Sequence, residues 1–382
     1  MDFEFTEEQK MFREAIRNFT QSEIAPLSDE CEKSERFPVE ILPKLGKMGY
    51  LCLTYSSKYG GVGLGKMGDC IELEEIGRVN ESIAATLSAQ LGASISPFCD
   101  HGSEEQQQKY VVPVIRGEKI AAVGLTEPNA GSDVASIESV AKKNANTYIL
   151  NGAKNYVTSG TICDFVTVAA YTDKSKKYHG MSLIVIDKGT SGLSATKLHK
   201  FCHRSSDTAE IAYEDCVVPE ENLIGEEGKG FRYAMESLIG QRINHAAARI
   251  GGAEAAFQDA LDYAQQRVQF GRPIATFQAI AFKLARIATE IEAARWLVYN
   301  SAWLFDQGKP CDKESSMAKF LVSEVYQRAS IEAMEIFGGA ASLEESRVNR
   351  YYRDSYLGKI TEGTSEIQEL VIARQLGIRG IQ

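Results

Sequence analysis

The feature that most constrains the fold is a change of sequence pattern that occurs twice along the chain. Between about residues 120 and 228, short runs of β-branched and aromatic residues alternate with turn residues, while the segments on either side follow helical spacing. No long helical pattern separates these runs, so they predict a small antiparallel β domain or barrel. The five runs are Thr147–Leu150, Asn155–Thr158, Phe165–Val168, Met181–Ile186 and Ala209–Tyr213.

The two flanking parts predict helical domains. Thr6 and Gln9 have the spacing of a capping box and precede an apolar stripe, so the chain is expected to open with an amphipathic helix. Beyond Gly230, four long periodic segments predict a helical bundle: 231–268, 278–307, 312–338 and 365–378. We therefore expect an α+β protein with a helical N-terminal domain (1–119), a middle β domain (120–228) and a C-terminal helical domain (229–382).

The composition excludes several classes of protein. With 382 residues and 44% hydrophobic content, the chain is long enough for two or three domains or one elaborated core. Its net charge of −10 leaves no sequence-wide basic surface, so nucleic-acid binding is not expected. No apolar run reaches the roughly 18 residues of a membrane span. The acidic N-terminus passes directly into a helical pattern, so we expect no targeting peptide and predict a cytoplasmic protein.

The cysteines and histidines show no metal-binding pattern. The eight cysteines include no C-x-x-C pair and combine with none of the five histidines in ligand spacing, so we expect reduced thiols and no metal site. The five histidines are interpreted as structural or exposed side chains: His101, His179, His199, His203 and His245.

The stretch from Thr361 to Gln368 is the first candidate for chemistry. Ser365 and Gln368 have the spacing of a capping box, so a helix is predicted to start there with its N-terminus open to an anion such as a pyrophosphate. Glu362 precedes that helix beside a flexible glycine. A carboxylate in a dry pocket can serve as a general base, although on these residues alone a surface glutamate before an ordinary cap is the favoured interpretation.

A glycine-rich stretch near residue 65 superficially suits a nucleotide. The pattern Gly63-x-Gly65-x-x-Gly68 follows an apolar run and resembles a dinucleotide fingerprint, which would make the protein a nicotinamide dehydrogenase. It also nearly forms a phosphate-binding P-loop, but Met67 stands where a serine or threonine is needed, and no βαβ pattern follows. A tight interhelical turn is the favoured interpretation.

Two further pieces lie in the β segment. Leu125–Asp133 combines a proline, a permissive glycine and hydroxyl side chains suited to presenting donors to a polar ring edge, although it also reads as an ordinary turn. Tyr156 and Thr158 alternate on a predicted strand and are expected to share a face. An aromatic ring beside a hydroxyl can stack on a flat cofactor, and a core tyrosine is the competing interpretation.

Together with Glu362, these pieces resemble the acyl-CoA dehydrogenase family of flavoproteins across nearly the whole chain. The resemblance implies a helical N-terminal domain, a middle β domain and a C-terminal four-helix bundle, assembled as a homotetramer. The matching motifs are Tyr59–Gly63, Leu125–Asp133, Asn151–Thr158, Gly225–Phe231, Arg267–Pro273, Phe277–Gln278, Phe337–Gly339, Tyr352–Asp354 and Glu362–Ser365.

The resemblance also implies a reaction. In this family the base removes the α-proton of an acyl-CoA thioester, and the β-carbon delivers a hydride to N5 of FAD, leaving a trans-2-enoyl thioester. Glu362 matches the usual base; the alternative position on the first bundle helix is Gln241, which cannot serve. The Glu362 N–H would hold the enolate oxygen, Gly363 suits close approach to the substrate, and Ser132 and Arg242 are candidate substrate contacts.

The FAD-binding residues implied by the resemblance fall into three groups. The first would hold the isoalloxazine, with Thr158 near N5; the second would reach the FAD of a neighbouring subunit; and the third would meet the pyrophosphate. In that order they are Val123, Leu125, Thr126, Gly131, Ser132, Tyr156, Thr158 and Ser159; Arg267, Phe270, Gln278, Glu335, Gly338 and Gly339; and Thr364 and Glu366.

Alternatives remain open at this point. An electron-transfer flavoprotein is the expected acceptor, but a carrier-protein-bound substrate, an enoyl reductase, an oxidase and a flavin-free binding or assembly protein on the same scaffold are also compatible. Four departures from the family pattern weigh against a plain straight-chain fatty acyl substrate. They are Tyr156 for a common tryptophan, Glu366 for a frequent glutamine, Cys202–Arg204 for a Gly-x-Arg turn, and Ala340–Ser342 for a glycine and aromatic segment.

Overall fold

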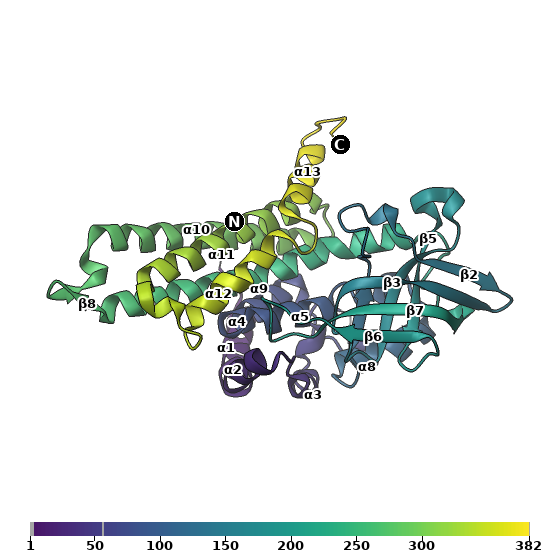
Figure 1. Ribbon diagram of the computed structural model, residues 1–382, viewed down its shortest axis with the longest axis horizontal. Helices are drawn as coiled ribbons and strands as arrows, with labels where there is room; N and C mark the ends of the chain where they lie inside the picture. Colours follow the sequence, from purple (N-terminus) through teal and green to yellow (C-terminus); the bar gives the residue numbers. More distant parts are fainter. Residues whose placement is uncertain (1–3, 56, 382) are drawn as a thin grey trace.

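The computed structural model describes residues 4–55 and 57–381 and has the predicted order of helical, β and helical parts. The β part lies at one end of the molecule, the long helices of the C-terminal part extend toward the other end, and the N-terminal helices pack beside their junction (Figure 1). One hydrophobic core joins the N-terminal helices to the C-terminal ones, and two further clusters lie in the region of the sheet.

The N-terminal part consists of short helices, and its first helix begins as expected. Thr6 Oγ1 accepts from Gln9 N at 3.2 Å, and Gln9 Oε1 accepts from Thr6 N at 3.0 Å, so the predicted capping box is confirmed. The helices are α1 (Glu7–Phe19), α2 (Ala25–Ser34), α3 (Leu42–Lys47), α4 (Gly65–Val79), α5 (Glu81–Leu91), α6 (Ser96–His101), α7 (Glu104–Gln106) and α8 (Val112–Ile115).

The glycine-rich stretch is an interhelical turn, as favoured. The apolar run before it forms a 3₁₀ turn, Tyr50–Cys52, and among the described residues the first strand starts only at Ala121, so the strand that a dinucleotide fold requires is not there. The Asp306 carboxylate accepts from the backbone N–H groups of Lys66 and Met67 at 2.6 and 3.1 Å. The N-terminus of α4 is therefore capped by a carboxylate of this chain, which leaves no open phosphate cradle.

The middle part is a seven-stranded sheet, largely antiparallel, in the order β1-β4-β2-β3-β7-β6 with β5 paired to β4. Two pairings, β1 with β4 and β2 with β4, are parallel. A bulge interrupts β3 between Lys154 and Val157. The strands are β1 (Ala121–Gly124), β2 (Val140–Asn144), β3 (Thr147–Thr158), β4 (Phe165–Tyr171), β5 (Met181–Asp187), β6 (Leu193–Lys197) and β7 (Thr208–Pro219).

The C-terminal part is built on long helices, and α9 packs directly against α4. The two backbones approach so closely that a Cβ on Gly77 would meet Ala248 O at 2.2 Å, and one on Gly251 would meet Glu74 O at 2.2 Å. Among the described residues, no helix is both long and apolar enough to cross a membrane. The helices are α9 (Gly230–Gln266), α10 (Gln278–Asp306), α11 (Asp312–Phe337), α12 (Arg347–Ser355) and α13 (Ser365–Gln375), with a hairpin of β8 (Val268–Gln269) and β9 (Arg272–Pro273).

Candidate active site

Glu362 lies on a short loop between the 3₁₀ turn η11 (Tyr356–Lys359) and α13, and the backbone of this loop is held by buried side chains. Gly363 O accepts from Lys319 Nζ at 2.6 Å and from Gln368 Nε2 at 3.0 Å. Gln368 Nε2 also donates to Glu362 O at 3.1 Å. Glu362 and Gly363 both have positive φ, 57° and 90°. Because few residues other than glycine accept this conformation, the hydrogen bonds hold the loop in a shape that it would not keep alone.

The predicted capping box at Ser365 is wrong. The N-cap of α13 is Thr364, whose hydroxyl accepts from Ile367 N at 3.3 Å, and the buried Ser365 hydroxyl has no partner among the described residues. Gln368 does not reach back to the cap either, because its amide is used by the carbonyls of Glu362 and Gly363. The glutamine thus fixes the loop that carries Glu362 rather than the start of the helix.

Three polar side chains of α9 face the Glu362 loop. Arg242, His245 and Arg249 are spaced by three and four residues, which places them on one face of the helix, and all three are buried. His245 Nε2 lies 3.5 Å from Glu362 Oε1. Arg249 Nη2 donates to Thr361 Oγ1 at 2.6 Å, one residue before Glu362. Gly358 makes room for this arginine, because a Cβ there would meet Arg249 Nε at 3.2 Å.

Burial and the nearby cations shift the pKa of Glu362 in opposite directions. Burial raises the pKa of Glu362, and the cations of Arg249, Arg242 and Lys319 oppose this rise. Burial, with Arg249 adding to it, lowers the pKa of Lys319 to about 7. Burial also lowers the pKa of His245 well below its usual range, so this imidazole is neutral. The site therefore holds a carboxylate with a raised pKa beside a neutral histidine, which suits a general base.

Gln241, at the family's alternative position for the base, is fixed between two elements. Its Nε2 donates to Ser88 Oγ on α5 at 3.1 Å, and its Oε1 accepts from Ala93 N at 3.2 Å. A Cβ on Gly92 would meet Gln241 Oε1 at 1.8 Å. The side chain thus fills the space beside Gly92 and Ala93.

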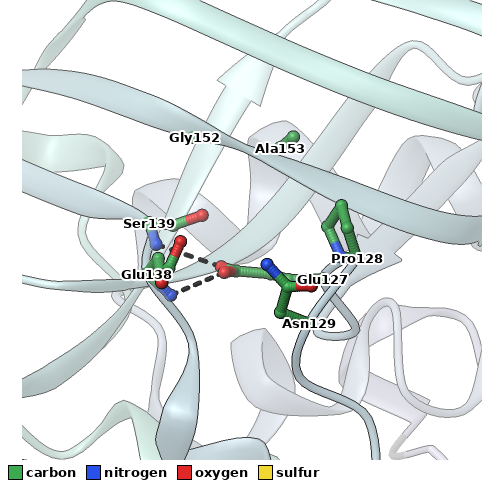
Figure 2. Close-up of a pocket in the computed structure, with 7 residues that line it drawn as sticks. All are labelled: Glu127, Pro128, Asn129, Glu138, Ser139, Gly152 and Ala153. Carbon is green, nitrogen blue, oxygen red and sulfur yellow. Dashed lines mark hydrogen bonds between the residues drawn. The ribbon is translucent and has the colours of Figure 1, made fainter.

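The loop at the entry to the sheet is fixed by a buried ion pair. Glu127 accepts from Glu138 N at 2.5 Å and from Ser139 N at 3.1 Å (Figure 2). It also accepts from Lys154 Nζ at 2.7 Å. A pocket beside these groups is lined by residues 127–129, 138–139 and 152–153, and includes no residue of the Glu362 loop. We interpret the ion pair as structural, because its carboxylate is fully used in holding the 125–133 loop against β2 and β3.

The first group of predicted cofactor residues gathers along β1, β3 and this loop, with differing accessibility. Tyr156 lies at the bulge of β3 with a φ of 58°, and its side chain is 70% exposed. Gly131 and Ser132 are exposed, Thr158 is half-buried, and Ser159 is buried. The prediction that Tyr156 and Thr158 share a face assumed regular alternation along the strand. The bulge interrupts this alternation, and the Tyr156 ring is exposed because its own backbone is left-handed.

The second group lies far from the first. Arg267 and Phe270 belong to the β8–β9 hairpin region, at the opposite end of the molecule from the sheet (Figure 1). Phe270 is 94% exposed. Exposed residues of this group also include Gln278, Glu335, Gly338 and Gly339. One flavin cannot contact both groups within one chain.

Comparison with known proteins decides the family. Family models for the N-terminal, middle and C-terminal domains of acyl-CoA dehydrogenase match residues 6–118, 122–216 and 228–377. The chain belongs to the acyl-CoA dehydrogenase family. This acyl-CoA dehydrogenase homologue is 40% identical to a short-chain-specific acyl-CoA dehydrogenase of Clostridium acetobutylicum over 98% of this chain and 100% of the relative. The implied enzyme class, an oxidoreductase acting on a CH–CH bond, is thereby confirmed.

Two further relatives extend the comparison. The solved structure of butyryl-CoA dehydrogenase from Megasphaera elsdenii has a TM-score of 0.96 and 40% identity, covering 99% of this chain and 100% of that one. The CarC subunit of a caffeyl-CoA reductase–Etf complex from Acetobacterium woodii is 41% identical over 97% of this chain and 99% of the relative. This acyl-CoA dehydrogenase homologue thus resembles proteins named both for dehydrogenation and for reduction.

The sequence interpretation missed His245, Arg249 and Lys319, which structure brings to the Glu362 loop. His245 had been taken as structural or exposed by default. Part of this grouping is visible in the sequence. His245 and Arg249 follow Arg242, a predicted substrate contact, at helical spacing, which indicates one shared helix face. Lys319 carries no such signal, because its position on α11 becomes meaningful only when α11 packs against the loop.

Proposed function

We propose that this protein oxidises a short acyl-CoA thioester to its trans-2-enoyl thioester, with Glu362 as the base. The observation that carries the proposal is the Glu362 carboxylate itself, which burial makes more basic and which three cations and a fixed loop hold in place. The α-carbon–hydrogen bond breaks as its proton passes to this carboxylate, and the β-carbon loses a hydride. When bound, FAD supplies the oxidant that accepts this hydride at N5.

The residues around Glu362 prepare it for this step. Lys319 and Gln368 hold the two carbonyls of the loop, so the carboxylate needs no reorganisation as it takes the proton. The Glu362 N–H has no recorded acceptor among the described residues and is available for the thioester oxygen. We also propose Arg242 and Ser132 as substrate contacts. Arg242 is buried and interacts electrostatically with Glu362, and Ser132 is exposed.

The residues proposed to hold FAD fit a flat, anionic group. The exposed Tyr156 ring offers an aromatic surface, the 125–133 loop supplies hydroxyls from Thr126 and Ser132, and the end of β3 supplies that of Thr158. Thr364 and Glu366, at the N-terminus of α13, are proposed to meet the pyrophosphate. Arg267 and Phe270 project from the far end, which supports their contact with the FAD of a second subunit in a homotetramer.

The proposed substrate is short. Gln241 occupies the space beside Gly92 and Ala93, and its two hydrogen bonds bridge α9 to α5 and the following turn. A straight chain long enough to pass this point would have to displace the amide and leave its partners unpaired. This position supports an acyl group of about the length that the names of the short-chain and butyryl relatives suggest.

Reduction of an enoyl thioester is the second candidate. The 41% identity to a caffeyl-CoA reductase subunit favours it, since the same base would then return the proton to the α-carbon. For either direction we propose an electron-transfer flavoprotein as the redox partner and CoA, rather than a carrier protein, as the acyl holder. Six of the described cysteines are free thiols, which supports the proposed cytoplasmic location; they are Cys31, Cys70, Cys163, Cys202, Cys216 and Cys311.

The test is anaerobic addition of acyl-CoA thioesters to the purified protein while flavin absorbance is followed, with Glu362→Gln beside the wild type. A yellow protein that a short thioester bleaches, with the rate reduced about 10²–10⁴-fold in the variant, would support the proposal. A yellow protein that no acyl-CoA bleaches, but whose flavin, once reduced chemically, is reoxidised by enoyl-CoA, would favour the reductase. A folded protein that neither contains nor takes up flavin would show that the proposal is wrong.

A further inference from the structure

The inference begins with Arg249, whose hydrogen-bonding capacity is only partly used. Its side chain is 1% exposed, and Nη2 donates to Thr361 Oγ1. Its Nε and Nη1 have no hydrogen-bond partner among the described residues. A guanidinium stays charged at all accessible pH values, and a buried one without full pairing is destabilised by several kcal/mol. Its unused donors lie beside the loop that carries Glu362.

The nearest carboxylate does not satisfy this arginine. Glu81 Oε1 lies 3.8 Å from Arg249 Nε, beyond hydrogen-bond distance, and the other Glu81 oxygen pairs with His203 Nε2. Burial lowers the pKa of His203, but the Glu81 carboxylate more than offsets this and raises it, so the two side chains form a charged pair. Glu81 is therefore largely neutralised by His203, and the charge of Arg249 is opposed by Glu81 and Glu362 without a hydrogen bond to either carboxylate.

Two neighbouring side chains also have unused polar atoms. Both ring nitrogens of His245 and the Tyr326 hydroxyl lack a hydrogen-bond partner among the described residues, and both side chains are buried. His245 contacts the base at 3.5 Å, and Tyr326 packs on α9 at Gly252, three residues from Arg249. A pocket for a purely apolar chain would be lined by apolar groups here. Instead, polar side chains follow this face of α9, with His245 beside the base and Tyr326 on the far side of Arg249.

We propose that the acyl group of the substrate ends in a carboxylate, which Arg249 binds with help from His245 and Tyr326. The substrate class is then the CoA monothioester of a short dicarboxylic acid. This inference rests on the proposed function, because it assigns the acyl chain to the space beside Glu362. A carboxylate on Nη1 would complete the pairing of the guanidinium with charge-assisted hydrogen bonds, and the His203 cation offsets repulsion from Glu81.

The first experiment compares matched substrates on the FAD-loaded enzyme. Glutaryl-CoA is tested against 5-methylhexanoyl-CoA, which has the same size and branching but lacks the charge, and against hexanoyl-CoA, by anaerobic flavin reduction. The wild type is expected to favour the dicarboxylic thioester in kcat/KM by about 10- to 100-fold. Equal or faster reduction by the apolar thioesters would overturn this inference and leave the proposed function standing. Bleaching by none of them, nor by butyryl-CoA, would count against both.

The second experiment assigns the preference to residues. Arg249→Met is expected to abolish the preference in kcat/KM for the dicarboxylic over the apolar thioester. Tyr326→Phe, which preserves packing, is expected to reduce this preference several-fold. Lys319→Met is the control, because it also removes a cation near Glu362. The Lys319 ammonium already donates to Gly363 O, so we expect the preference for the dicarboxylic thioester to persist in this variant even if the rate falls. Binding of glutaryl-CoA to Glu362→Gln, measured by titration calorimetry, reports affinity without turnover. Loss of the ratio in Lys319→Met but not in Tyr326→Phe would contradict direct carboxylate binding.

Discussion

The Nε2 atom of His245 lies 3.5 Å from Oε1 of Glu362, and the imidazole is neutral because burial and nearby cations lower its pKa well below the usual range. A neutral histidine at this distance adds polarity beside the base without adding a charge. The basicity of Glu362 is therefore set by burial and by the cations of Arg249, Arg242 and Lys319.

The first prediction is a single ionisation on the acid side of the pH profile. Burial raises the pKa of Glu362, so the rate of flavin reduction should rise with pH at a midpoint above the ordinary glutamate value of 4.5. His245→Gln should leave the number of ionisations unchanged, because the histidine is already neutral. Stopped-flow reduction from pH 5 to 8 checks this. An inflection near pH 6.5 that disappears in the variant would contradict it.

The second prediction concerns Gly363. Gly363→Ala places a Cβ at a φ of 90° and 2.8 Å from Gln368 Nε2, so the loop must shift and Glu362 with it. We expect a destabilisation of about 1–3 kcal/mol and at least a tenfold loss of the reduction rate, with FAD retained. Gly189→Ala is the control, since its φ of 83° is similar but no atom lies within 4 Å of the new Cβ. Similar rates in the two variants would argue against this geometry.

The third prediction concerns chain length. Gln241→Ala removes the amide that fills the space beside Gly92 and Ala93. The kcat/KM for hexanoyl-CoA relative to butyryl-CoA should rise about tenfold, because two more methylene groups at about 0.8 kcal/mol each can be buried. Gln258→Ala, an exposed change on the same helix, should leave this ratio unaltered. An unchanged ratio in Gln241→Ala would place the acyl chain elsewhere.

The fourth prediction concerns the far end of the bundle. Phe270 is 94% exposed and Arg267 is also exposed, as expected for residues that contact a second subunit. Arg267→Ala should lower the FAD content of the purified protein, measured as the ratio of absorbance at about 450 nm to that at 280 nm. Arg116→Ala, an exposed arginine of the N-terminal part, serves as the control. Full FAD occupancy with an intact oligomer in Arg267→Ala would exclude this role.

The fifth prediction is a stability difference that depends on pH. Lys319 loses its proton near pH 7 in the folded protein and near 10.5 when unfolded, so the unfolded state binds more protons between these values. Wild-type stability should then rise with pH relative to Lys319→Met, by up to about 1.4 kcal/mol per pH unit above pH 7. Thermal midpoints of both proteins at pH 7, 8 and 9 provide the measurement. Parallel pH dependences would show that Lys319 is not desolvated.

Much of the fold was determined by local patterns in the sequence. The long bundle helices and the Thr6 capping box were predicted from spacing, because helix periodicity and capping depend on residues within a few positions of one another. The strands of the middle part were recognised where β-branched residues cluster. The short strands β2 and β6, which are rich in lysine, serine and alanine, were missed, since pairing with neighbours rather than composition makes them strands.

The site depended on the tertiary structure to a greater degree. The sequence identified Glu362 through its resemblance to a family, and by itself could not show that the side chain is largely removed from solvent or which cations surround it. Lys319, Gln368 and Arg249 reach one loop from three different helices, and their effect on Glu362 arises from desolvation and distance, which no local spacing encodes. The same reason explains the wrong cap at Ser365: the amide of Gln368 could pair with the cap or with the loop, and the packing of α13 against α11 decided for the loop.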